Sequence, residues 1–226
     1  MDKIKAFLKE NNIKYKNLDL YKKAFTHSSY THESKNDDAS YERMEFLGDS
    51  ILGKIVAEHL FLNYPEYDQG DMTLVKHHLV NKNFLAVIGK KLGFEKIIYL
   101  GEGEDRDSLS VSIYEDVFES LVAAIYLDAG PQTAINFVNK HICSKSGEVS
   151  LGDVKDPKTR LQELLQSVKR KSVTYEIVKE EKIDNVNYFD AIVIFDGNKL
   201  GQGRGLSKKE AEKNAARNAY EKAVLK

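Results

Sequence analysis

The sequence predicts a two-domain protein, in which an all-α domain of residues 1–143 precedes a small α+β domain of residues 156–226. Apolar residues recur at helical spacing from Ile4 to Lys140, and strand-like runs occur only later in the chain. Between the two parts, residues 144–155 are rich in small and polar residues without periodicity, which is typical of a linker. The two parts also differ in the sign of their charge.

Bulk composition excludes several classes of protein. Cutting the 226-residue chain after residue 150 leaves a net charge of −5 on the first part and +4 on the second, as expected if one part holds cations and the other a polyanion. The single Cys143 excludes an internal disulfide and a cysteine-based zinc site. The start of the chain lacks the apolar core of a signal peptide, and Asp128 and Pro131 interrupt the most apolar window, Ser120 to Val138. We therefore expect a cytoplasmic protein with no membrane role.

The first domain is expected to contain about seven to nine helices. Turn signals separate its segments, and the clearest are NYPEYDQGD at residues 63–71 and the pair Gly130-Pro131. Neither repeats nor low-complexity segments interrupt it.

The second domain is expected to follow the order helix, three strands, helix. Asp156 and Pro157 can cap and start its first helix. The apolar positions of that helix are Leu161, Leu164, Leu165 and Val168. The strand-like runs lie at residues 173–178, 188–195 and 199–202. The hairpin signal Asp196-Gly197 connects the last two runs.

The last helix carries its start signal in Ser207 and Glu210, which form a capping-box pattern. Lys208 and Lys209 then fall in its first turn, where the helix dipole disfavours cations, and Lys213 follows about one and a half turns later. Phosphate binding explains these lysines better than helix stability does; a solvated basic face is the alternative. The residues expected against the sheet are Ala211, Ala215, Ala219 and Val224.

Carboxylates lie where a core-forming helix is expected. In YERMEFLGDSIL, residues 41–52, helical geometry places Glu42, Glu45 and Asp49 in one stripe with apolar residues on both of its edges. No cationic side chain of this helix points toward the stripe. The acids are therefore expected to lack a partner on their own helix.

A second apolar segment, residues 112–128, repeats the pattern with Asp116 and Glu119 at i and i+3. Burying charge without a partner is costly, so facing pairs of acids would be compensated best by a divalent cation. An all-oxygen donor set favours Mg²⁺ or Mn²⁺ over zinc. The alternative is that these acids lie at the surface or pair with distant Lys or Arg side chains.

The sequence ERMEFLGDSIL resembles the signature helix of ribonuclease III, E-x-L-E-F-L-G-D-x-x-L. AFTHSSYTHE at 24–33, the segment 64–94 and YEDVFESLVAAIYLDAG at 114–130 extend the resemblance in register. The tail, with DPKTRLQELLQ, FDAIVIFDGNKLGQGRG and SKKEAEKNAA, resembles the double-stranded-RNA-binding domain of bacterial members. The resemblance covers nearly the whole chain.

This resemblance implies metal-dependent hydrolysis of double-stranded RNA, in the processing of ribosomal and other structured precursors. It places the family's metal-binding carboxylates at Glu45, Asp49, Asp116 and Glu119. Asp49 and Glu119 are expected to be catalytic as well, with Mg²⁺ as the cofactor and Mn²⁺ able to replace it.

A homodimer is also implied, with one catalytic site in each subunit. Phe46 matches an interface aromatic of related enzymes, with ordinary core packing as its alternative. Glu42 is assigned a supporting or interface role, or a structural one.

In the second domain, Thr159, Gln162 and Glu163 match positions that reach minor-groove hydroxyls, and Lys208, Lys209 and Lys213 are expected to contact phosphates. Where the family carries Gly-Pro-x-His, this chain has residues 182–185, so Asn185 is expected to anchor the minor groove more weakly. Gln69 in the first domain is a second departure, because the family commonly has an acid at this position.

Two alternatives to an endoribonuclease remain open at this point. A binding-only protein would hold double-stranded RNA without cutting it, and a scaffold would use the helical domain only to dimerise.

GQGRG at 201–205 lacks the spacing of a nucleotide-binding loop, and the resemblance makes it the turn into the last helix.

Overall fold

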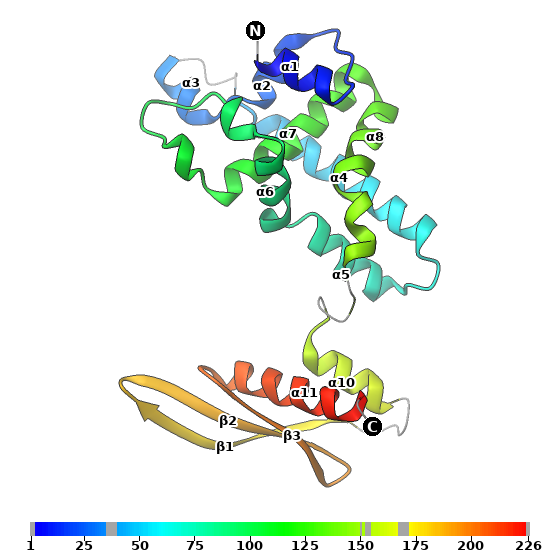
Figure 1. The fold of residues 1–226 in the computed structure, drawn as a ribbon, viewed down its shortest axis with the longest axis vertical. Coiled ribbons are helices and arrows are strands. Elements are labelled where there is room, and N and C mark those ends of the chain that lie inside the picture. Colours follow the sequence, from blue (N-terminus) through cyan, green and yellow to red (C-terminus); the bar gives the residue numbers. More distant parts are fainter. Residues whose placement is uncertain (1–2, 35–39, 150, 152–154, 167–171, 225–226) are drawn as a thin grey trace. The chain divides into compact units, whose positions relative to one another are not determined.

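The computed structural model describes residues 3–34, 40–149, 151, 155–166 and 172–224. The chain divides into two compact units, Met1–Leu151 and Gly152–Lys226, each of which is described by itself (Figure 1).

The first unit is helical, and the described residues contain eight α-helices, within the expected range. They are α1 Lys3–Glu10, α2 Leu18–Ala24, α3 Ser28–Ser34, α4 Glu42–Asn63, α5 Gln69–Leu79, α6 Lys82–Lys91, α7 Val111–Ala129 and α8 Pro131–His141. The 3₁₀ turns η2 Phe94–Lys96, η3 Arg106–Ser108 and η4 Cys143–Glu148 accompany them. Among the described residues, no helix is both long and apolar enough to cross a bilayer.

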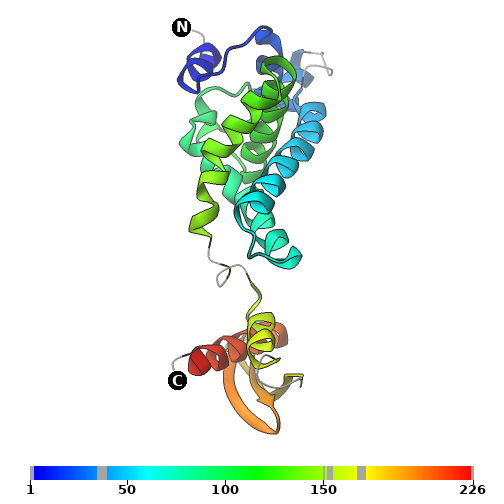
Figure 2. The same cartoon turned by 90° about the vertical axis from the view of Figure 1, so that its right-hand side faces the viewer.

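Helix α7 forms the centre of this unit. It contacts α2, α4, α6 and α8, and every residue from Val117 to Ile125 is buried. Figure 2 shows α4 running alongside α7 and α8. Fully burying a large apolar side chain contributes about 1.5–3 kcal/mol, so this helix supplies much of the core. Functional groups on α7 are thereby held on a rigid element.

Local sequence signals set the helix boundaries. Side-chain oxygens of Asn17, Asp68, Asn81 and Ser110 accept hydrogen bonds from the first turns of α2, α5, α6 and α7, respectively. Gly130 takes a positive φ of 89° before Pro131 opens α8. The turn signals at residues 63–71 and at Gly130-Pro131 are confirmed.

The second unit is a three-stranded antiparallel sheet with two helices on one face (Figure 1). Its elements are α10 Pro157–Gln166, β1 Thr174–Ile183, β2 Val186–Phe195, β3 Asn198–Gly205 and α11 Lys208–Val224. Leu161 of α10 packs with Ala191 and Val193 of β2 and with Ala215 of α11 in one buried cluster. The order helix, three strands, helix is confirmed. Val168 lies outside the described residues, as does the side chain of Val224.

The strands are longer than expected at two places. β1 and β2 continue to a two-residue turn of Asp184 and Asn185, whose φ values of 48° and 65° are both positive. β3 continues through Gly205, so GQGRG is strand and not the turn into the last helix. A Cβ on Gly203 would lie 2.2 Å from the backbone nitrogen of Ala215, which shows that glycine permits the close approach of α11.

The segment expected as a linker begins with the 3₁₀ turn η4. Ser146 in this turn is buried, and its hydroxyl lies 2.8 Å from the Tyr64 hydroxyl and 3.1 Å from Nε2 of His59. The polar character of this stretch therefore also reflects a buried hydrogen-bond network on α4. Cys143 beside it is buried, and burial raises the pKa of its thiol to about 11.

Candidate functional sites

The first site lies where α4 crosses α7. A Cβ added to Gly48 would lie 1.8 Å from the carbonyl oxygen of Glu119, so only glycine allows the two backbones to touch here. The contact brings the stretch of α4 that carries Glu45 and Asp49 next to the stretch of α7 that carries Asp116 and Glu119. Two helices are needed because neither carries all four carboxylates.

Glu119 shows how strongly these acids interact. It is only 7% exposed, and its pKa is raised to about 8 by burial first and then by Asp49, Glu115, Glu45 and Asp116. The other three expected carboxylates therefore all lie close enough to Glu119 to act on its charge, as does Glu115, which the sequence did not indicate.

The other acids surround Glu119 at increasing exposure. Asp116 and Glu45 are half-buried, whereas Asp49 is exposed. Burial, followed by Asp116 and Glu42, raises the pKa of Glu45. Burial also raises the pKa of Asp116, and a hydrogen bond from Tyr41 and the charge of His27 oppose this rise. The cluster thus opens from a buried acid on α7 toward solvent at α4.

No lysine or arginine of the described residues forms an ion pair with Glu45, Asp49, Asp116 or Glu119. Lys54 of α4 pairs with Glu58 instead. Asp128, another buried acid of α7, shows the usual solution, since its carboxylate accepts the backbone N–H groups of Lys16 and Asn17 at 2.8 Å each. The carboxylate of Glu119 accepts no hydrogen bond from any described residue.

The chemistry of this donor set fits a hard divalent cation, because every donor is a carboxylate oxygen and no lysine or arginine of the described residues pairs with the four acids. Within the part of the chain that the structure describes, no three acidic, His or Cys side chains already converge as metal ligands. Binding a cation therefore requires these side chains to turn toward one another.

Two residues near the cluster were missed by the sequence reasoning, apart from Glu115. Gly48 has a signal in hindsight, because a glycine inside a helix costs about 1 kcal/mol relative to alanine and so indicates close packing. No local sequence pattern indicates Tyr41, because its hydrogen bond to Asp116 spans 75 residues of sequence.

Glu42 and Phe46 lie at the rim of the cluster. Glu42 is exposed, and it contributes to the raised pKa values of Glu45 and Asp116. Phe46 is 81% exposed, so it does not belong to the core of the single chain.

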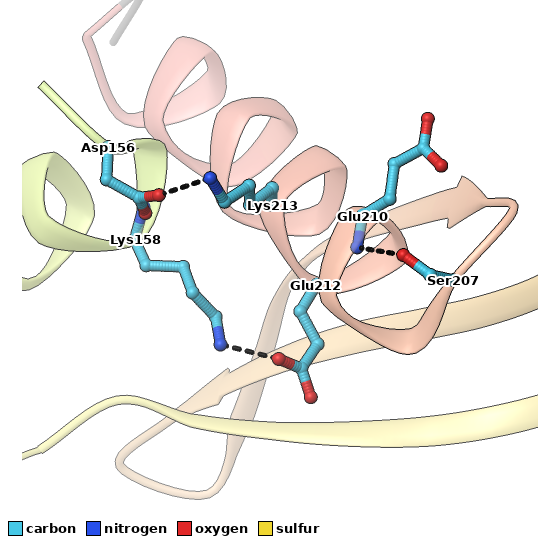
Figure 3. Close-up of polar contacts among 6 residues, drawn as sticks. All are labelled: Asp156, Lys158, Ser207, Glu210, Glu212 and Lys213. Atoms are coloured by element: carbon cyan, nitrogen blue, oxygen red, sulfur yellow. Dashed lines mark hydrogen bonds and ion pairs between the residues drawn. The ribbon is translucent and has the colours of Figure 1, made fainter. Parts of the chain in front are cut away.

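The second candidate site is the start of α11 and the neighbouring part of α10. Ser207 caps α11, since its Oγ accepts the N–H of Glu210 at 3.2 Å (Figure 3). The expected capping box is completed at Leu206, whose N–H donates to the Glu210 carboxylate at 2.8 Å. Lys208 and Lys209 therefore do lie in the first turn of α11, and both are exposed.

The expected phosphate-binding lysines are accompanied by acids. Lys213 Nζ lies 2.7 Å from Oδ2 of Asp156, and Lys208 pairs with Glu180 of β1 (Figure 3 shows the first pair). Burial alone would raise the pKa of Asp156, but hydrogen bonds from Lys213 and from the backbone of Lys158 lower it. Phosphates would have to compete with these carboxylates.

The expected minor-groove residues differ in their availability. Thr159 is exposed, whereas Gln162 Oε1 accepts the N–H of Val173 at 2.9 Å and Glu163 pairs with Lys155 at 3.1 Å. Asn185 is exposed in the tight turn between β1 and β2. Part of the polar surface of α10 thus stabilises the module itself.

Comparison with known proteins gives one consistent result. Residues 17–146 match a family model described as ribonuclease-III-like, and residues 157–223 match a double-stranded RNA binding motif. Ribonuclease 3 of Mycoplasmopsis synoviae (strain 53) is 39% identical over 224 residues, which is 98% of this chain and 95% of that protein. Ribonuclease 3 of Pelotomaculum thermopropionicum is 38% identical over 228 residues, covering 99% and 95%.

A solved structure is similar to the helical unit. The nuclease domain of ribonuclease III from Campylobacter jejuni is 28% identical, with a TM-score of 0.55, and the match covers 61% of this chain and 97% of that one. That structure is described as showing flexibility in a region involved in dimer formation.

Proposed function

The chain belongs to the ribonuclease III family and is an endoribonuclease, and we propose that it hydrolyses double-stranded RNA with a divalent cation held by Glu45, Asp49, Asp116 and Glu119. The observation that carries this proposal is Glu119, a buried acid surrounded by other acids and without a hydrogen-bond donor or cation among the described residues. Mg²⁺ is the proposed cofactor, and Mn²⁺ should replace it.

When bound, the cation lowers the pKa of a coordinated water and stabilises the charge on the phosphate oxygens. The chain must then supply ionised ligands in a pocket of limited water access. Glu119 and Asp116 on α7 provide the rigid, more buried side, whereas Asp49 lies on the exposed side that RNA can reach. We assign catalytic roles to Asp49 and Glu119.

We further propose that the protein acts as a homodimer. Exposed apolar residues on α4 support this, because Phe46, Phe61 and Leu62 are 81%, 69% and 67% exposed. A hollow of about 370 Å³ between α4, α7 and α8, lined in part by Ile51 and Tyr126, offers a place for a partner's side chain.

The second unit is proposed to hold the duplex with Lys208, Lys209 and Lys213 on phosphates, and with Thr159, Gln162, Glu163 and Asn185 toward the minor groove. Structured RNA precursors, ribosomal ones included, are the proposed cytoplasmic substrates.

Cleavage of a labelled RNA duplex and of its single strand tests this function, with wild type and Glu119→Gln in Mg²⁺ and in Ca²⁺. We expect wild type to cut the duplex in Mg²⁺ only and the variant not to cut it. Tight duplex binding by wild type without any cleavage in Mg²⁺ or Mn²⁺ would instead favour the binding-only alternative.

A further inference from the structure

Tyr41 connects the two helices of the carboxylate site at its inner edge. It is only 3% exposed, and its hydroxyl donates to Oδ2 of Asp116 at 3.1 Å, from the residue before α4 to the first half of α7. A tyrosine hydroxyl carries its proton at neutral pH, so this group is the donor and the Asp116 carboxylate the acceptor.

The backbone holds this side chain in place. The N–H of Tyr41 donates to Thr26 O at 3.0 Å, and its carbonyl oxygen accepts the N–H groups of Met44 and Glu45 at 2.8 and 2.9 Å. Tyr41 is the N-cap residue of α4, but its side chain makes no capping hydrogen bond. The hydroxyl is therefore committed to Asp116 and not to the helix end.

His27 supports the tyrosine ring from the other side. The two ring centroids are 5.7 Å apart, and Nδ1 of His27 lies 2.7 Å from the Ser29 hydroxyl. Ser29 Oγ in turn accepts the N–H of Gly101 at 3.1 Å. The tyrosine ring thus packs against a hydrogen-bonded histidine whose charge also acts on Asp116.

A neutral phenol suits this position because it donates a hydrogen bond without adding a positive charge to the cluster. A lysine or arginine in its place would pair with Asp116 and would compete with an incoming cation. The Tyr41 hydroxyl instead fixes one carboxylate oxygen, Oδ2, by a hydrogen bond.

From this geometry we propose that Tyr41 is a positioning residue for the metal site: its hydroxyl holds the Asp116 carboxylate in the orientation that a divalent cation requires. The inference rests on the proposed function, since it takes Asp116 to be a metal ligand. Partners of this kind typically change metal affinity about 10- to 100-fold when they are removed.

The test compares Tyr41→Phe with Tyr114→Phe in the full chain. Tyr114 is also buried, lies on α7 two residues before Asp116, and makes no hydrogen bond to a carboxylate of the cluster among the described residues. Mn²⁺ binding is measured by calorimetry without RNA, cleavage is measured against Mg²⁺ concentration, and thermal unfolding is followed in EDTA.

We expect Tyr41→Phe to bind Mn²⁺ about tenfold more weakly and to need about tenfold more Mg²⁺ for half-maximal cleavage. Tyr114→Phe should match wild type in both. If Tyr41→Phe binds Mn²⁺ as wild type does, or merely melts at a lower temperature, the positioning role is wrong. If wild type itself binds no Mn²⁺ and cuts no duplex, the proposed function fails instead.

Discussion

At the scale of single residues, Glu119 and Asp128 show two ways in which one helix accommodates a buried acid. The Asp128 carboxylate accepts two backbone N–H groups at 2.8 Å each, whereas the charged groups that act on Glu119 are all acids. A protein gains nothing in stability from the second arrangement, because each burial without a partner disfavours the charged form. Such a residue indicates function.

The raised pKa of Glu119 has a consequence for stability. Its pKa rises from 4.5 to about 8 on folding, so the folded protein binds this proton more tightly than the unfolded chain does. The resulting contribution to the free energy of unfolding is fully present below about pH 4.5 and is lost as the pH rises to about 8. In EDTA above pH 8, we expect Glu119→Gln to melt on the order of 5 °C higher than wild type. The difference should shrink toward zero near pH 4.5, and calorimetric melting curves across this range measure it. An equal difference at every pH would contradict the assignment.

Lys208 provides a second test at this scale. Its ion pair with Glu180 must exchange for a phosphate when RNA binds, and an exposed pair of this kind is worth at most about 1 kcal/mol. Glu180→Gln should therefore tighten duplex binding by about two- to fivefold at low salt and steepen the salt dependence. Glu176→Gln, an equal charge change on the same strand, controls for net charge. Equal effects of the two variants, measured by RNA titration in EDTA, would rule out a specific role for the pair.

At the scale of elements, the crossing of α4 and α7 determines the site. Helical spacing alone indicated which residues of each helix share a face, and the structure confirms both helices. Helical spacing could not indicate how close the axes of α4 and α7 come, because that distance depends on residues far apart in sequence. Gly48 provides the missing information, since a Cβ at this position would lie 1.8 Å from the carbonyl oxygen of Glu119.

Gly48→Ala should separate the two helices, because the new Cβ would lie 1.8 Å from a backbone oxygen that cannot turn aside. We expect a loss of about 3 kcal/mol in the free energy of unfolding together with the loss of cleavage. Gly53→Ala, on the same helix, meets only the flexible end of Lys76 at 3.5 Å and should be neutral or stabilising by about 0.5–1 kcal/mol. Urea unfolding of both variants decides between a crossing that requires glycine and one that tolerates alanine.

The second unit shows where the sequence was least informative. The Asp196-Gly197 signal and the capping box at Ser207 were correct because each depends on adjacent residues. The extension of β3 through Gly205 was missed, because glycines are unfavourable in strands and their reason here is the backbone of α11. Pairing of Lys208 and Lys213 with Glu180 and Asp156 likewise depends on tertiary contacts.

At the scale of the whole molecule, the exposed apolar residues of α4 support the proposed dimer. Phe46→Asp should shift the protein from dimer to monomer at micromolar concentration in sedimentation velocity, because it places a charge where an apolar contact is proposed. Val87→Asp, the same kind of change at an exposed apolar residue of α6, should leave the dimer intact. A wild-type protein that sediments as a monomer would contradict the dimer directly.

The central claim is that a divalent cation compensates the acids around Glu119. The most direct measurement is the melting temperature of wild type and Glu119→Gln at pH 8.5, with EDTA and with Mg²⁺ at several concentrations. The account predicts that Mg²⁺ raises the melting temperature of wild type in a concentration-dependent way and has a much smaller effect on the variant, because the cation replaces the missing partner of Glu119. An equal response of the two proteins to Mg²⁺ would show that the cation does not bind at these carboxylates, and the proposed site would be wrong.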